Sequence, residues 1–257
     1  MDKNTPELWD NFWEKNELRQ DDLDAVKYEL LTIRWQRIEN ITIDHFGQFE
    51  GLNILEIGGG IGTNAALMAK MGANVSILDY SKKALKRSEK LFNELGLKVN
   101  LIQDDALSLS SKYKSKFDIT MSFGLAEHFI GEERQRIIET HIKALKQGGV
   151  TFISVPNKYN PPYRIYKYLA QKARFWSVGE EYPYSRGEFK EICKSLKIKD
   201  YLFIGDSFYW SLNFINPIQI LKKVLKIKYN YYCTKKQRGS FLDSHFSYAI
   251  ILVCKKK

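Results

Sequence analysis

The residues best suited to chemistry lie in a glycine-rich segment, EIGGGIG, at positions 56–62, directly after a short apolar run. Glycine has no Cβ, so such a segment turns tightly and lets the backbone approach a ligand closely. The glycines fall in a GxGxG spacing, and Thr63 stands where the dinucleotide fingerprint GxGxxG would place its last glycine. The spacing therefore disfavours a nicotinamide oxidoreductase.

Carboxylates follow the next two apolar runs. Asp79 comes 21 residues after Gly58 and can accept hydrogen bonds from both hydroxyls of a ribose, although a plain helix cap is the alternative. Asp104 and Asp105 follow the third run, and either can accept from an adenine amino group; the alanine at position 106 favours Asp105. Ligands of open α/β sheets bind beyond the carboxyl ends of the strands. Three successive strand ends therefore indicate one adenosine-sized ligand.

The segments around these residues alternate between strand and helix patterns. Apolar runs predict strands, and the stretches between them predict helices over 82–95, with Ser81 as N-cap and Gly96 as terminator, and over 132–146. Strands that alternate with helices of ten or more residues indicate a parallel sheet covered on both faces. The predicted strands are 53–57, 75–79, 99–103, 117–123 and 150–155.

The two ends of the chain depart from this alternation. Residues 7–46 predict a short helix with Trp9, Phe12 and Trp13 on one face, then a second helix that steps from Leu23 to Ile41. After position 157 we expect two lid-like excursions from the sheet. They cover 157–184 and 207–240, and the elements between and after them are a helix over 187–197 and strands over 201–204 and 245–254.

Taken together, these motifs resemble the class I S-adenosylmethionine (SAM)-dependent methyltransferases, in their small-molecule, ubiquinone-pathway-like branch. The resemblance covers roughly residues 50–157 and is carried by the acidic and glycine-rich residues above, by FDITMSFGLAEHF at 117–129 and by ALKQGGVTFISVPN at 144–157. It implies a Rossmann-like three-layer α/β sandwich, whose seven-stranded, mostly parallel sheet has an antiparallel last strand inserted beside strand five. We expect one methyltransferase domain over 1–257, with an N-terminal helical cap (1–48), a cofactor-binding core (50–156) and the two lid insertions.

The resemblance also implies which residues bind the cofactor, S-adenosyl-L-methionine. The glycines would line its methionine part, Asp79 would hold its ribose, and the residues after the fourth strand would lie beside it. The expected cofactor-binding residues are Glu56, Gly58, Gly60, Gly62, Asp79, Tyr80, Asp105, Ala106, Ser122 and Phe123.

His128 is the candidate general base, because it follows the fourth strand in the sequence AEHF. A histidine in the first turn of a surface helix is the alternative interpretation. A subset of related enzymes shows E-x-x-E-H here and binds a divalent metal. Glu127 and His128 match that motif, but Gly124 stands where its first glutamate would be, so no metal site is predicted.

The composition constrains location and partners. Apolar residues make up 44% and charged residues 27% of the chain, and no run of about 18 apolar residues predicts a membrane span. The N-terminus lacks the apolar core of a secretory signal, and three scattered cysteines indicate a reduced, cytoplasmic protein without disulfides or structural zinc.

The net charge of +10 is concentrated near the C-terminus, where residues 221–257 hold ten Lys/Arg and one acid. A basic amphipathic helix beginning near Ile218 could lie on an anionic membrane surface, or be a lid helix with solvated lysines. We expect a small-molecule or lipid-like acceptor, methylated on oxygen or nitrogen, and a peripheral membrane contact. An RNA methyltransferase and a non-catalytic SAM-binding protein remain as alternatives; the incomplete metal motif and the lack of an appended RNA-binding module argue against nucleic acid.

Overall fold

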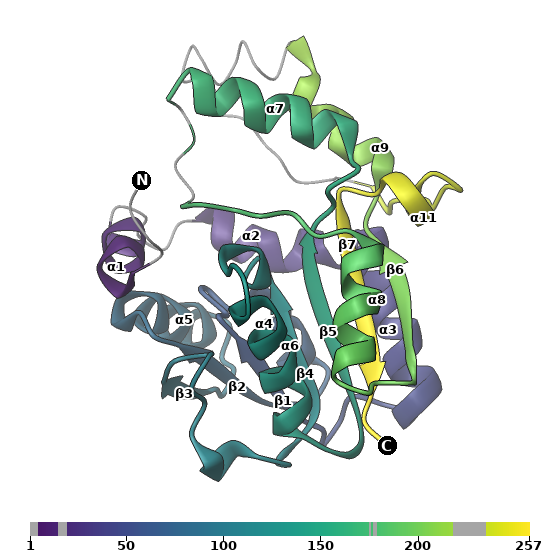
Figure 1. Ribbon diagram of the computed structural model, residues 1–257. Coiled ribbons are helices and arrows are strands. Elements are labelled where there is room, and N and C mark those ends of the chain that lie inside the picture. Colours follow the sequence, from purple (N-terminus) through teal and green to yellow (C-terminus); the bar gives the residue numbers. More distant parts are fainter. Residues whose placement is uncertain (1–4, 15–19, 175, 177–178, 218–234) are drawn as a thin grey trace.

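The computed structural model describes residues 5–14, 20–174, 176, 179–217 and 235–257. A seven-stranded sheet with the order β3-β2-β1-β4-β5-β7-β6 forms its centre (Figure 1). Strand β7 is antiparallel to both of its neighbours, β5 and β6, and the remaining pairs are parallel. The predicted sheet, with its inserted antiparallel last strand, is therefore confirmed. The strands are β1 (Asn53–Ile57), β2 (Asn74–Asp79), β3 (Asn100–Gln103), β4 (Phe117–Phe123), β5 (Leu145–Pro156), β6 (Tyr201–Gly205) and β7 (Ala249–Lys255).

Helices cover both faces of the sheet and make it the middle of three layers. One buried cluster joins the sheet to α3 (Ile33–Phe46), α4 (Thr63–Lys70) and α5 (Lys82–Glu94). A second cluster joins the opposite face to α6 (Glu133–Ala144) and α8 (Arg186–Ser195). The strands alternate their side chains between these two clusters, as strands buried on both faces must.

The predicted helix 132–146 was too long, because α6 ends at Ala144 and β5 begins at Leu145. The pairing of β4 with β5 shifts register between Phe117 and Ile119, and this shift accommodates the extra residues of β5. Gly148 has a φ of 77° and donates its N–H to the carbonyl of Lys256. The two glycines that suggested a helix end therefore form an irregularity within a strand instead.

The predicted second N-terminal helix is in fact two helices, α2 (Gln20–Glu29) and α3. Thr32 begins α3, because its hydroxyl accepts a hydrogen bond from the backbone N–H of Trp35. Arg34 then reaches back across the break to Glu29, with an Nε–Oε1 distance of 2.7 Å. The continuous apolar spacing did not reveal this break, because an N-cap threonine can also stand within a helix.

The last strand was also predicted too long, since the short helix α11 (Asp243–Phe246) precedes β7. The Asp243 carboxylate accepts from the backbone N–H groups of Ser240 and Phe208, and this fixes the turn before the strand. Residues 245–248 are therefore not part of the sheet.

Helices from the two predicted excursions lie at the upper end of Figure 1, above the sheet. The first contains α7 (Pro161–Lys172), and the second contains α9 (Phe208–Ser211) and the 3₁₀ helix η3 (Leu212–Ile215). Aromatic contacts join them, including Tyr163 with Phe214 at a ring distance of 6.0 Å. The predicted basic amphipathic helix falls mainly on residues 218–234, outside the described part of the chain.

Candidate functional site

The glycine segment forms the loop between β1 and α4, and its conformation requires glycine. Gly60 has a φ of 54°, and a Cβ there would lie 2.8 Å from the Trp13 ring. Gly58 has a φ of 62°, and a Cβ there would meet the Leu125 side chain at 2.6 Å. Both positions therefore combine a left-handed backbone with a close approach, and only glycine satisfies both.

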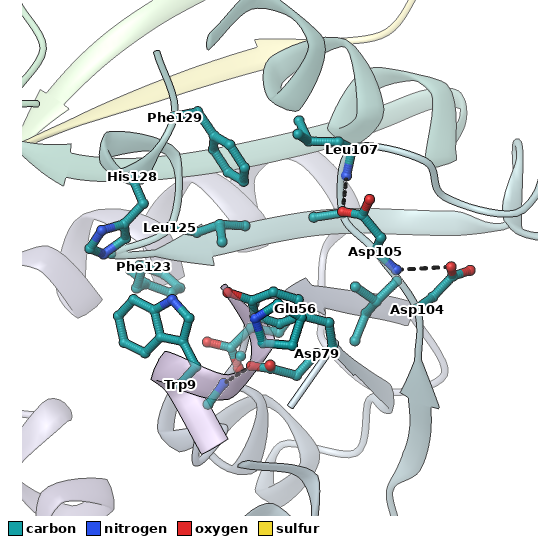
Figure 2. A pocket seen from close by; sticks show the side chains of 18 of the residues that line it. Trp9, Glu56, Asp79, Asp104, Asp105, Leu107, Phe123, Leu125, His128 and Phe129 are labelled. Atoms are coloured by element: carbon teal, nitrogen blue, oxygen red, sulfur yellow. Dashed lines mark hydrogen bonds between the residues drawn. The ribbon is translucent and has the colours of Figure 1, made fainter. Parts of the chain in front are cut away.

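Two buried carboxylates hold this loop in place (Figure 2). Asp79, at the end of β2, accepts from the backbone N–H of Gly60 at 3.1 Å and of Ser81 at 2.9 Å. Glu56 accepts from the N–H of Ala65 at 3.0 Å, at the start of α4. Burial raises the pKa of Asp79 to about 6 and that of Glu56 to about 8. Both predicted residues therefore lie at the cavity, and both also support its walls.

The residues after β3 form a tight turn that supplies another part of the cavity wall. Asp105 accepts from the N–H of Leu107 at 2.9 Å and from the hydroxyl of Ser108 at 3.1 Å. Asp104 accepts from the N–H of Asp105 at 2.9 Å and of Ser110 at 3.2 Å. Both aspartates and Ala106 line the cavity, so the geometry leaves the choice between Asp104 and Asp105 open.

The glycine loop, Glu56, Asp79, Asp104, Asp105 and Ala106 line one cavity of about 1370 Å³. It extends from the strand ends to the segment after β4, where Phe123 and His128 form part of its wall. Tyr80 also lines it. Of the predicted cofactor residues, Ser122 is the exception: its side chain is fully buried and it does not line the cavity. Alternation along β4 explains this, because Ser122 and Phe123 face opposite sides of the sheet.

His128 lies in the 3₁₀ helix η2 (Ala126–His128) and lines the cavity. Its Nδ1 is 2.8 Å from the carbonyl oxygen of Glu180, and its ring meets that of Trp9 edge-on at 5.0 Å. Burial, together with the positive charge of Lys167, lowers the pKa of His128. Because a carbonyl only accepts, Nδ1 carries the proton of the neutral ring, and Nε2 is then the basic nitrogen.

Several cavity residues were not predicted as site residues. Trp9 and Trp13 come from α1 (Pro6–Glu14), which lies beside the glycine loop, and Glu180 and Tyr182 come from the chain after α7. The aromatic face of α1 was visible in the sequence, but its position over the loop was not. The contacts that hold it include a hydrogen bond from the Ser81 hydroxyl to Asp10.

A divalent metal can be tested against the residues present. Glu127, His128 and Glu181 each offer a ligand atom, and these atoms lie within 4.8 Å of one another. Gly124 adds no ligand, and the Lys167 ammonium already lies 3.7 Å from Oε2 of Glu181. A positive charge beside two carboxylates removes much of their attraction for a cation. The residues as they stand therefore do not fit a divalent ion.

Residues 54–149 match the family described as "Methyltransferase domain". A ubiquinone biosynthesis O-methyltransferase of Rickettsia canadensis is 27% identical over 58% of this chain and 61% of its own length. The corresponding protein of Caulobacter vibrioides is also 27% identical, over 60% of this chain and 58% of its own length. The chain thus spans about three-fifths of the length of these relatives.

The fold has matching solved structures. The magnesium protoporphyrin IX methyltransferase from Synechocystis, with bound S-adenosylhomocysteine (SAH), superposes with a TM-score of 0.59 at 15% identity. The match covers 98% of this chain and 93% of that one. Residues 54–149 thus match a methyltransferase domain, and the fold is that of a solved SAH-binding methyltransferase. The glycine loop and the acidic strand ends lie at the carboxyl edge of the sheet, and the Synechocystis enzyme has also been solved with bound SAM.

Proposed function

We propose that this chain transfers the methyl group of SAM to an oxygen or nitrogen atom of a small or lipid-like acceptor. The observation that carries the proposal is the continuity of the cavity from Asp105 to His128. Its volume of about 1370 Å³ exceeds the roughly 300–1000 Å³ that is usual for one small ligand. A cofactor and an acceptor can therefore occupy it together. The names of the relatives favour oxygen as the methylated atom.

In this proposal the cofactor residues are those predicted from the sequence, with Ser122 acting only through its backbone. When bound, SAM supplies a methyl group that is already activated by the sulfonium charge. The chain therefore has to align the acceptor, exclude water and remove a proton. His128 lies on the cavity wall with a lowered pKa, so its neutral ring can take the proton of an acceptor hydroxyl at Nε2.

The acceptor would lie between α1 and the segment after α7, in a single domain that includes both insertions. Phe129, Ile130 and Tyr182 provide apolar and aromatic surface in that part of the cavity. An acceptor with an aromatic or aliphatic part would be desolvated there, which favours a partly apolar molecule over a strongly charged one.

A lipid-like acceptor agrees with the outer surface of α7. Ile165, Tyr168 and Leu169 share one helical face there and are 49%, 57% and 53% exposed. Arg164 and Lys172 flank this face, and residues 157–176 contain no acid. We propose that it makes a peripheral contact with anionic lipid, which the sequence had suggested for a later segment. None of the described helices is long and apolar enough to cross a membrane.

The test is methyl transfer itself. The protein would be incubated with SAM and a panel of hydroxylated aromatic compounds, amines and RNA, and SAH would be measured together with the mass gain of each acceptor. We expect transfer to a hydroxylated, partly apolar compound, and a fall in rate of roughly 10²-fold or more in the variant His128→Asn. Transfer to RNA alone would overturn the acceptor class, and SAH binding without any transfer would favour a non-catalytic role.

Membrane contact has its own test, namely flotation with vesicles of anionic or neutral lipid. Binding to anionic vesicles should be lost in Ile165→Asp/Leu169→Asp. A matched double substitution on another exposed surface, Leu30→Asp/Ile43→Asp, should leave it unchanged. Equal binding by both variants would contradict the α7 contact.

A further inference from the structure

Three charged side chains meet behind His128, away from the cofactor. Glu127 comes from η2, Lys167 from α7, and Glu181 from the extended chain that follows α7. Glu127 is 2% exposed and Lys167 is 6% exposed, so both charged groups are nearly removed from water. Isolated buried charges are strongly destabilising, so the members of such a cluster either pair with opposite charges or take up protons.

Lys167 is the positive member of this cluster. Its ammonium donates to the carbonyl oxygen of Glu181 at 2.6 Å and lies 3.7 Å from Oε2 of the same residue. It also lies 5.1 Å from the centre of the Trp176 ring. The Tyr163 hydroxyl donates to Oε2 of Glu181 at 2.6 Å. Glu181 is therefore held by two residues of α7, through its main chain and its carboxylate.

Glu127 is the less well satisfied carboxylate. Its Oε2 is buried and has no hydrogen-bond partner among the residues that the structure describes. Arg134 is the other nearby cation, but its Nε contacts Glu188 at 2.6 Å and its Nη1 donates to the carbonyl of Tyr182. Burial and the negative charge of Glu181 raise the pKa of Glu127, whereas a backbone hydrogen bond, the Lys167 ammonium and the Arg134 guanidinium oppose this rise.

The same segment also orients the candidate base. The carbonyl of Glu180 accepts from His128, and the N–H of Tyr182 donates to the carbonyl of Glu127 at 2.7 Å. Residue 181 lies between these two contacts, and Lys167 fixes it there. Displacement of this segment would therefore release the His128 ring.

We propose that Lys167 is a positioning residue whose ammonium takes the place of a divalent ion, balancing Glu127 and Glu181 and holding the 180–182 segment against His128. The sequence has Gly124 where the related metal-binding motif has its first glutamate, and the structure places a lysine of α7 beside the two remaining carboxylates. These two features are complementary, because a cluster with fewer carboxylates needs less positive charge. The link to His128 rests on the proposed function, whereas the charge balance does not.

The first experiment measures Mn²⁺ binding by electron paramagnetic resonance after removal of metals with a chelator. Wild type should bind no stoichiometric Mn²⁺. Lys167→Met should bind one Mn²⁺ per chain, and this binding should be lost in Lys167→Met/Glu181→Gln. Lys172→Met, an exposed lysine of the same helix, is the matched control and should behave as wild type. One Mn²⁺ bound by wild type, or none bound by a folded Lys167→Met, would overturn the proposal.

A double-mutant cycle covers the case in which Lys167→Met folds poorly. Glu127→Gln/Lys167→Met restores the net charge of the wild-type cluster, so it should be more stable than Lys167→Met by roughly tenfold in the unfolding equilibrium constant. If the effects of the two single substitutions on the free energy of unfolding simply add in the double variant, the charge balance is contradicted. SAH binding and methyl transfer are measured separately on each variant, so that failure of this proposal can be told from failure of the proposed function. If wild type neither binds SAH nor transfers a methyl group, the proposed function is wrong but the charge balance is not affected.

Discussion

The two ends of the cavity are built in different ways. At the cofactor end, a glycine loop and acidic strand ends from one continuous part of the chain, residues 56–106, supply the wall. At the acceptor end, Trp9 of α1, η2 and the segment after α7 come together from three separate parts of the chain. The first end depends on backbone geometry at fixed spacing, and the second depends on tertiary packing. Substitutions should therefore have larger and more uniform effects at the cofactor end.

The largest effect is expected from Gly60→Val. A side chain at this left-handed position would be strained and would meet Trp13 at 2.8 Å, so both the loop and α1 would have to move. We expect SAH affinity to fall by more than roughly 100-fold, measured by calorimetry. Gly96→Val is the control, because Gly96 has a similar φ of 66° but no atom of the described residues lies within 4 Å of its Cβ position. Equal loss in both variants would show that general strain, rather than the site, is responsible.

The second effect concerns pH. Burial raises the pKa of Glu56 from 4.5 to about 8, so the folded state holds this proton more tightly than the unfolded state. Its stabilising contribution is complete below pH 4.5 and is lost as the pH rises to about 8. Relative to Glu56→Gln, the free energy of unfolding of wild type should fall by at most about 1.4 kcal/mol per pH unit between these two pH values. Urea unfolding at several pH values checks this, with the exposed Glu94→Gln as control; parallel curves for wild type and Glu56→Gln would contradict it.

The third effect concerns Asp79. The variant Asp79→Asn removes the negative charge of a carboxylate that would accept hydrogen bonds from the ribose hydroxyls. This carboxylate also accepts from the backbone N–H groups of Gly60 and Ser81. Loss of one charge-assisted contact costs about 1.5–3 kcal/mol, or roughly 10- to 100-fold in SAH affinity. Asp104→Asn and Asp105→Asn, measured alongside, would decide which of the two contacts the adenine. An unchanged affinity in Asp79→Asn would place the ribose elsewhere.

The smallest effect is expected at α1. Trp13→Ala removes a ring that covers the glycine loop but leaves every strand end intact. Loss of about 1 kcal/mol of apolar contact would weaken SAH binding roughly fivefold. Phe12→Ala, on the same helix but outside the cavity, should have less effect. A loss as large as that of Asp79→Asn would mean that the Trp13 ring contributes as much to cofactor binding as the ribose contact does.

The contrast between the two ends also explains how much could be predicted. Strand β1 and strand β4 were predicted to the residue, because a buried apolar run bounded by glycine or polar residues defines a strand. The limits of α6 and β7 were wrong, because Gly148 is bonded to Lys256 and Asp243 to Phe208, both distant in the sequence. Likewise, no spacing rule could bring Trp9, His128 and Glu180 together, since three separate elements position them.

Thermal unfolding with and without SAH, with NAD as the control ligand, tests the central claim most directly. SAH at 100 times its dissociation constant should add about 2.7 kcal/mol to the free energy of unfolding and raise Tm by roughly 5–10 °C. We expect this shift with SAH and none with NAD. No shift with SAH, in a protein that unfolds cooperatively, would contradict the cofactor assignment and leave only the fold.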